Sequence, residues 1–311
     1  MQTSRKLSFA VLAIGAVVAI VAPAAVTRAE PSEAAATRAE IQKTFGFLPG
    51  FMKQMPDALL PGFWQEMSGL EMNPNTALPG KVKELISLGV ASQIPCEYCI
   101  YAHTQFGKLN QASDAEVGEA IAVAALTRHW STFINGMAPD EQKFRAEIAQ
   151  LVGHVKKLVA GTAPAPKPMM VTDARTALED VRQNFGFVPE FIRRFPPEAL
   201  PGAWNMMKSV ELNPNTKLSG KHKSLIGLAV AAQIPCRFCV IADTEFAKLE
   251  GATDREIAEA LAMASMTRAG STALNGLQVD KPGFRRDIDR LVAGARKHAA
   301  MAAREKAMDG R

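Results

Sequence analysis

The sequence predicts an all-α protein made of two tandem helical bundle domains. Composition is the first observation: 48% of the residues are hydrophobic and only 6% are aromatic, with many Ala, Leu and Met, which favours helices. Periodicity is the second, since apolar side chains recur at helical spacing and no stretch shows the sustained alternation of a strand. The third is a long internal repeat, which predicts the tandem arrangement.

The repeat keeps one fixed offset along the chain. Residues 45–47, Phe-Gly-Phe, return as residues 185–187, and Asn135-Gly136 returns as Asn275-Gly276. The residue numbers of these pairs differ by 140 in each case, so no insertion separates the copies between them. A period of this length is too long for a solenoid and indicates two copies of one domain.

Domain boundaries follow from this repeat. We expect a first domain at residues 30–160 and a second at residues 173–311, each able to bury its own core. Residues 161–172 between them form a proline-rich linker. The net charge of +5 comes without a dense basic stripe, so no nucleic-acid partner is expected.

Residues 1–29 have the layout of a secretory signal peptide. Arg5 and Lys6 precede an apolar run that ends near Ala22, and small residues follow it. This run is shorter than the ~20 residues that a membrane span requires. We expect cleavage after Ala29 and a periplasmic or secreted protein, with an uncleaved membrane anchor as the alternative. In either case the domains lie where disulfides form and persist.

Within each copy, local signals predict the helices in chain order. Residues 80–94 place apolar side chains at helical spacing between polar ones. Pro95 suits the first position of a helix, so we expect the next helix to begin there. A capping box at Ser113 precedes a long apolar segment, and Thr253 repeats it in the second copy. Each domain is therefore expected to contain about five to seven helices.

The four cysteines of the chain form two matched Cys-x-x-Cys pairs, Cys96/Cys99 and Cys236/Cys239. In the first copy His103 follows four residues after Cys99, so two thiols and an imidazole share one helical face. The start of a helix favours a thiolate through its free N–H groups. Such a thiolate with a second thiol one turn away is the minimum equipment for two-cysteine redox chemistry.

A proton relay is predicted around the first pair. Glu84 lies on the preceding predicted helix, twelve residues before Cys96, and a helical hairpin would bring it beside His103. The carboxylate would then orient the imidazole, and the imidazole would take the thiol proton of Cys99. We therefore expect the pKa of Cys99 to lie below the ~8.5 of a free thiol.

Other kinds of site compete for the same cysteines. Haem attachment requires a His directly after the second Cys, where Ile100 and Val240 stand. A zinc site built from Cys96, Cys99 and His103 would be a poor tetrahedral set, so neither a metal nor a cofactor is expected. A structural disulfide would close too small a loop to stabilise much. Thioredoxin-like exchange is chemically close, but the alternating strands and helices of that fold are absent from the sequence pattern.

The second copy lacks the two side chains that the relay requires. Ser224 and Asp243 stand at the positions that match the glutamate and the histidine. A carboxylate one turn from Cys239 disfavours its thiolate and is too weak a base to deprotonate it. We expect Cys236 and Cys239 to cycle between dithiol and disulfide without attacking peroxide efficiently, either as an electron relay or as a remnant.

The arrangement of Glu84, Cys96, Cys99 and His103 resembles the active site of the alkylhydroperoxidase D / carboxymuconolactone decarboxylase family. The resemblance spans one full domain in each copy and implies an all-helical fold that assembles into trimers or larger rings. It also implies that Cys99 is peroxidatic and Cys96 resolving, with a Glu–His relay. The decarboxylase branch lacks the cysteine pair. Tyr98 stands where a further His can occur in the family.

The expected function is an exported thiol-dependent peroxidase of the alkylhydroperoxide reductase type. Its substrate would be a hydroperoxide, its reductant an unknown dithiol or protein, and its assembly a homo-oligomer. Two alternatives are a disulfide oxidoreductase that acts on protein thiols and a non-catalytic module whose disulfides are structural.

Overall fold

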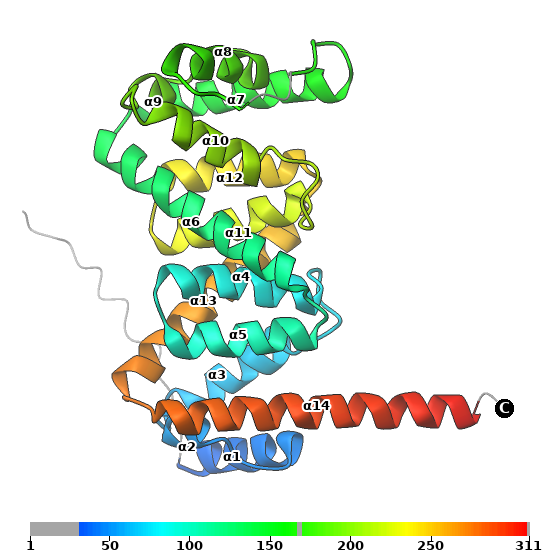
Figure 1. Ribbon diagram of the computed structural model, residues 1–311. Helices are drawn as coiled ribbons and strands as arrows, with labels where there is room; N and C mark the ends of the chain where they lie inside the picture. The colour runs from blue at the N-terminus through cyan, green and yellow to red at the C-terminus, as the bar shows by residue number, and fades with distance from the viewer. Residues whose placement is uncertain (1–30, 167–169, 310–311) are drawn as a thin grey trace, which may run out of the picture.

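A computed structural model describes residues 31–166 and 170–309, and the regular elements in these ranges are all helices (Figure 1). The all-α prediction is confirmed. The predicted signal peptide at residues 1–29 lies outside the described residues. Among the described helices, none combines the length and the apolar character that a membrane span needs.

The helices of the first copy recur in a similar order in the second. Those of the first copy are α1 Pro31–Phe45, α2 Gly50–Gln54, α3 Leu60–Glu66, the π-helical turn η1 Met67–Glu71, α4 Gly80–Gln93, α5 Glu97–Leu109, α6 Asp114–Met137 and α7 Glu141–Val159. Those of the second copy are α8 Ala174–Phe185, α9 Glu190–Arg193, α10 Leu200–Val210, α11 Gly220–Gln233, α12 Arg237–Leu249, α13 Asp254–Gly276 and α14 Lys281–Asp309.

Local capping sets where the long helices begin. The capping boxes predicted at Ser113 and Thr253 are both present, at the starts of α6 and α13. The helix predicted to open at Pro95 instead begins at Glu97, with Cys96 as its N-cap. The reason is that the Cys96 sulfur accepts a hydrogen bond from the backbone N–H of Cys99, at 3.3 Å, and so serves one of the free donors of the first turn.

The two copies exchange their last helices. α7 of the first copy packs on α8 and α12 of the second, while α14 of the second copy packs on α2 and α5 of the first. Figure 1 shows these two packed groups at opposite ends of the molecule. Between them, α4 and α11 pack directly on each other. A Cβ at Gly89 of α4 would lie only 2.9 Å from Ile226 Cγ2, so a glycine allows this close approach.

The hydrophobic cores consequently belong to both copies at once. One end cluster joins Phe144 and Ile148 of α7 to Phe191 and Trp204 of the second copy. At the other end, α14 side chains such as Phe284 enter a cluster with helices of the first copy. The expectation that each domain buries its own core is therefore wrong. The second copy covers the apolar face of α7, and the first copy covers that of α14. The two repeats therefore fold together as one unit.

Candidate redox site

The candidate site of the first copy lies in the hairpin of α4 and α5, which the sequence predicts. His103 Nδ1 lies 2.8 Å from Glu84 Oε2, so the two side chains form a hydrogen bond across the hairpin. Glu84 is 4% exposed and His103 is 8% exposed, which places this pair in the protein interior. The predicted juxtaposition of carboxylate and imidazole is thus present.

A third ionisable residue, Glu71, joins this pair and was not identified from the sequence. Its Oε1 atom lies 3.6 Å from the same Nδ1 atom of His103. Glu71 is the last residue of η1, a π-helical turn of the kind that often occurs at functional sites. The sequence holds one signal for it, since an acidic residue recurs as Glu211 shortly before the Asn-Pro-Asn turn.

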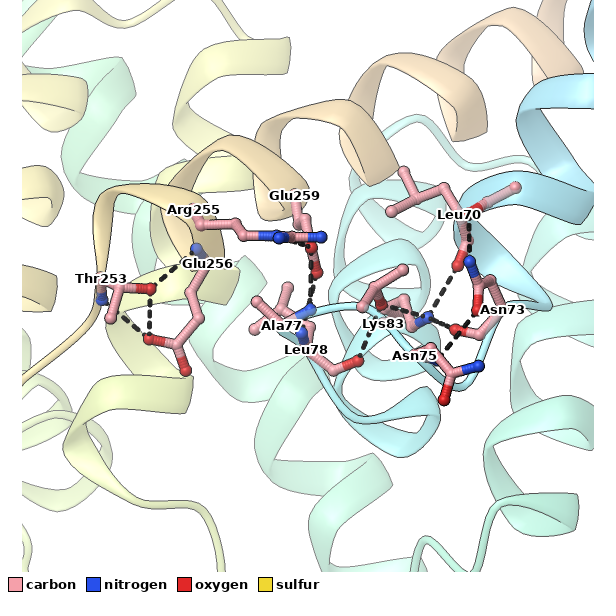
Figure 2. A network of polar contacts seen from close by, with 12 residues as sticks. Leu70, Asn73, Asn75, Ala77, Leu78, Lys83, Thr253, Arg255, Glu256 and Glu259 are labelled. Carbon is pink, nitrogen blue, oxygen red and sulfur yellow. Dashed lines mark hydrogen bonds and ion pairs between the residues drawn. The ribbon is translucent and has the colours of Figure 1, made fainter.

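A polar network fixes the segment that follows Glu71. Lys83 Nζ donates to the carbonyl oxygens of Leu70 and Asn73, at 2.7 and 2.8 Å. The backbone N–H groups of Ala77 and Leu78 donate to Glu259 of α13, both at 2.8 Å. Figure 2 shows these contacts converging on one loop. A helix of the second copy therefore helps to position the acidic cluster of the first.

Burial dominates the electrostatics of this cluster. It raises the pKa of Glu71 to about 7, with the Glu84 carboxylate adding to the effect, and it raises the pKa of Glu84 to about 8. Burial also lowers the pKa of His103, so the imidazole is neutral at pH 7 and can accept a proton. Near neutral pH the two carboxyl groups together retain a proton, and they titrate as a coupled pair.

The same three residues are also the candidate metal ligands of the described chain. Their ligand atoms lie within 4.8 Å of one another. Two buried carboxylates this close cannot both stay ionised without a cation, so Glu71 and Glu84 can share a proton beside the imidazole.

The cysteine pair is near enough for the charge of Cys96 to act on His103, and its two sulfur atoms are 2.7 Å apart. Cys96 is 1% exposed and Cys99 is 5% exposed, and both are free thiols. Asn275 of α13 donates to the Cys96 sulfur at 3.5 Å. The site of the first copy is therefore completed by a side chain of the second.

The negative charge of the ionised pair is located on Cys96. The hydrogen bond from the Cys99 thiol lowers the pKa of Cys96 to about 5, with smaller contributions from Ser271, the backbone of Cys99 and Asn275. The pKa of Cys99 is raised, first by its hydrogen bond to Cys96 and then by burial. The expectation that the pKa of Cys99 lies below the ~8.5 of a free thiol is therefore corrected, because the Cys99 thiol donates to Cys96 and is buried.

Comparison with known proteins places this geometry in a family. The model of the carboxymuconolactone decarboxylase family matches residues 58–142 and again residues 198–281, together more than half of the chain. The chain belongs to the carboxymuconolactone decarboxylase family. This agrees with the resemblance stated from the sequence.

Among solved structures, the chain is similar to a protein assigned as a gamma-carboxymuconolactone decarboxylase subunit from Burkholderia xenovorans LB400. The two are 15% identical with a TM-score of 0.48, and the match covers 88% of this chain and 98% of that one. No curated protein matches the chain.

Each segment matched to the carboxymuconolactone decarboxylase family contains one Cys-x-x-Cys pair, and the two pairs differ in state. Cys236 and Cys239 are joined by a disulfide. Beside them, burial raises the pKa of Asp243 well above its ordinary value, and the Glu211 carboxylate adds to this rise. A protonated carboxyl group cannot act as a base, so the second copy has no counterpart of the first copy's imidazole.

Proposed function

We propose that this member of the carboxymuconolactone decarboxylase family is a thiol-dependent peroxidase whose active copy is the first one. The observations that carry the proposal are two free thiols at the start of α5 and a buried hydrogen bond between Glu84 of α4 and His103 of the same α5. Two thiols supply the two electrons of hydroperoxide reduction, and the relay supplies the proton movements.

The reaction begins with a proton transfer inside the pair. The Cys99 thiol passes its proton across 2.7 Å to the Cys96 thiolate, so that Cys99 becomes the nucleophile. Cys99 is assigned this role because it lies one turn before His103 on α5, and because the family resemblance gives the attack to the second cysteine.

Attack then consumes the hydroperoxide. The Cys99 sulfur bonds to one peroxide oxygen as the O–O bond breaks, which yields a sulfenic acid and an alkoxide. A proton from the cluster of Glu71, Glu84 and His103 converts the alkoxide to the alcohol. The Cys96 thiol next attacks the sulfenic sulfur, which forms the disulfide and releases water. An external dithiol then reduces the disulfide and is itself oxidised.

Burial supports a small substrate. With 1% and 5% of the two cysteines exposed, a protein disulfide has little access to either sulfur, whereas a small hydroperoxide needs far less room. This argues against the disulfide oxidoreductase alternative. The signal-like residues 1–29 support export to the periplasm or secretion, and the family resemblance supports assembly into a trimer or larger ring.

The proposal is tested by incubating the purified protein with hydrogen peroxide or an organic hydroperoxide and a generic dithiol. We expect multiple-turnover loss of peroxide, matched by oxidation of the dithiol. An assay of lactone decarboxylation with the same preparation is the comparison. Decarboxylation without peroxide loss would overturn the proposal.

A further inference from the structure

A cavity of about 200 Å³ lies next to the disulfide of the second copy. Its walls come from both copies, with α6 and α7 of the first facing α8 to α12 of the second. Five aromatic side chains line it: Trp130, Phe144, Phe185, Phe191 and Phe246. A wall of this kind favours an aromatic or aliphatic occupant.

The cavity lies where the second copy has lost its relay. Ser224 and Asp243 line it, and they are shorter than Glu84 and His103, which stand at the matching positions of the first copy. The exchange of two large side chains for two small ones removes the base and leaves room beside Cys239. The substitutions that disfavour catalysis therefore also create space for a ligand.

Two polar atoms of the lining residues lack hydrogen-bond partners among the described residues. The indole Nε1 of Trp130 and the carboxyl Oδ2 of Asp243 are both buried and unpaired. One is a donor, and the other belongs to a carboxyl group that burial keeps protonated. Unpaired buried polar groups are costly, so these two atoms are available for hydrogen bonds to a ligand in the cavity.

We propose that the second copy is a binding site for a small, uncharged aromatic molecule that carries a hydroxyl group. A hydroxyl can accept from the Trp130 indole and can donate to the Asp243 carboxyl group, and a single ring fits the volume. An apolar cavity of about 150 Å³ takes up benzene. The lining residues of the cavity include no Lys or Arg, so an anionic ring compound would lose its water without gaining a cation and is excluded. This site is separate from the proposed peroxidase chemistry.

The test measures binding of phenol, benzene and benzoate to the full protein by calorimetry. We expect saturable binding of one phenol per chain, about tenfold weaker binding of benzene, and no detectable binding of benzoate. Asp243→Leu should weaken phenol binding about tenfold and leave benzene binding nearly unchanged, because it removes a hydrogen bond and keeps the branched shape of the side chain. Trp130→Phe should act in the same direction.

Matched controls separate this site from the first copy. Ala242→Phe should fill the cavity and abolish binding of phenol and benzene alike. Peroxide consumption should be unchanged in Asp243→Leu, since this residue is not part of the first site. If Asp243→Leu failed to fold, the Trp130→Phe comparison would decide alone. Absence of saturable phenol binding, or equal affinities for phenol and benzene in every variant, would overturn the proposal and assign the two polar atoms to water.

Discussion

Within the cysteine pair of the first copy, the position of each sulfur decides its charge. Cys96 caps α5 and accepts hydrogen bonds from Cys99 and from Asn275 of the second copy. Cys99 lies inside the helix and shares its proton with its neighbour. Sequence spacing correctly brings Cys96 and Cys99 together at the start of α5, and Glu84 to His103. It could not give the pKa order, because that depends first on which thiol donates to the other, and then on burial and on donors from α13, a helix far away in the chain.

The two thiol pKa values should depend on each other. Cys99→Ala should raise the pKa of Cys96 from about 5 toward the ~8.5 of a free thiol, because the largest cause of its lowering is the hydrogen bond from the Cys99 thiol. Cys96→Ser should lower the pKa of Cys99 for the converse reason. The pH dependence of alkylation measures both, with Cys236 and Cys239 replaced by Ser. A Cys96 pKa that stays near 5 without Cys99 would contradict this assignment.

The acidic cluster should control how activity depends on pH. Glu71 and Glu84 have pKa values raised to about 7 and 8, so they are protonated in acid and become carboxylates as pH rises through this range. The proposed mechanism takes the proton of the alcohol from this cluster, so kcat/KM should fall between pH 7 and 8 as the cluster loses its protons. Glu84→Gln should lower kcat/KM about 100-fold and shift this fall. In the control, Glu211→Gln, the fall should stay in place; an unchanged profile in Glu84→Gln would reject the relay.

At the level of secondary-structure elements, the sequence predicts helices better than their irregularities. Apolar spacing and capping boxes identify α4 and α6, and the hairpin that joins Glu84 to His103 follows from them. No sequence pattern predicts the π-helical turn η1, because its backbone conformation is fixed by packing and by the contacts of Lys83. Glu71, which η1 places in the site, was therefore missed.

The corresponding acidic residue after α10 should make stability depend on pH. Burial raises the pKa of Glu211 to about 7 from an ordinary 4.5. The folded state therefore binds a proton that the unfolded state releases, so the stabilisation is complete below pH 4.5 and is lost as pH rises through 7. The loss from this residue should be about 3 kcal/mol.

Denaturant unfolding at pH 5 and pH 8 measures this effect. Glu211→Gln should make the free energy of unfolding less dependent on pH. Glu245→Gln, at an exposed position, is the control and should have the same pH dependence as the unsubstituted protein. Equal pH dependence in all three proteins would show that the buried carboxyl group does not have the raised pKa.

At the scale of the whole molecule, the repeat predicts two copies but not their exchange of helices. The internal repeat shows which residues of the two copies correspond. It does not show which copy covers the apolar face of α7. The structure buries Phe144 against the second copy and Phe284 against the first. Sequence similarity alone cannot distinguish the two arrangements, since both bury equivalent side chains.

The exchange predicts that a broken linker is tolerated. When residues 31–163 and 170–309 are produced together as separate chains, they should co-purify as a stable one-to-one complex, because α7 and α14 each pack on the other copy. Size-exclusion chromatography with mass measurement gives the result. Two halves that elute separately as folded monomers would contradict the shared cores.

The central claim, that catalysis belongs to the first copy, is tested most directly by peroxide consumption in matched cysteine variants. Cys99→Ser removes the proposed nucleophile beside His103, and Cys239→Ser removes its counterpart beside Asp243. The first substitution should abolish peroxide turnover with a generic dithiol, and the second should retain most of it. Equal losses from the two substitutions, or a larger loss from Cys239→Ser, would contradict it.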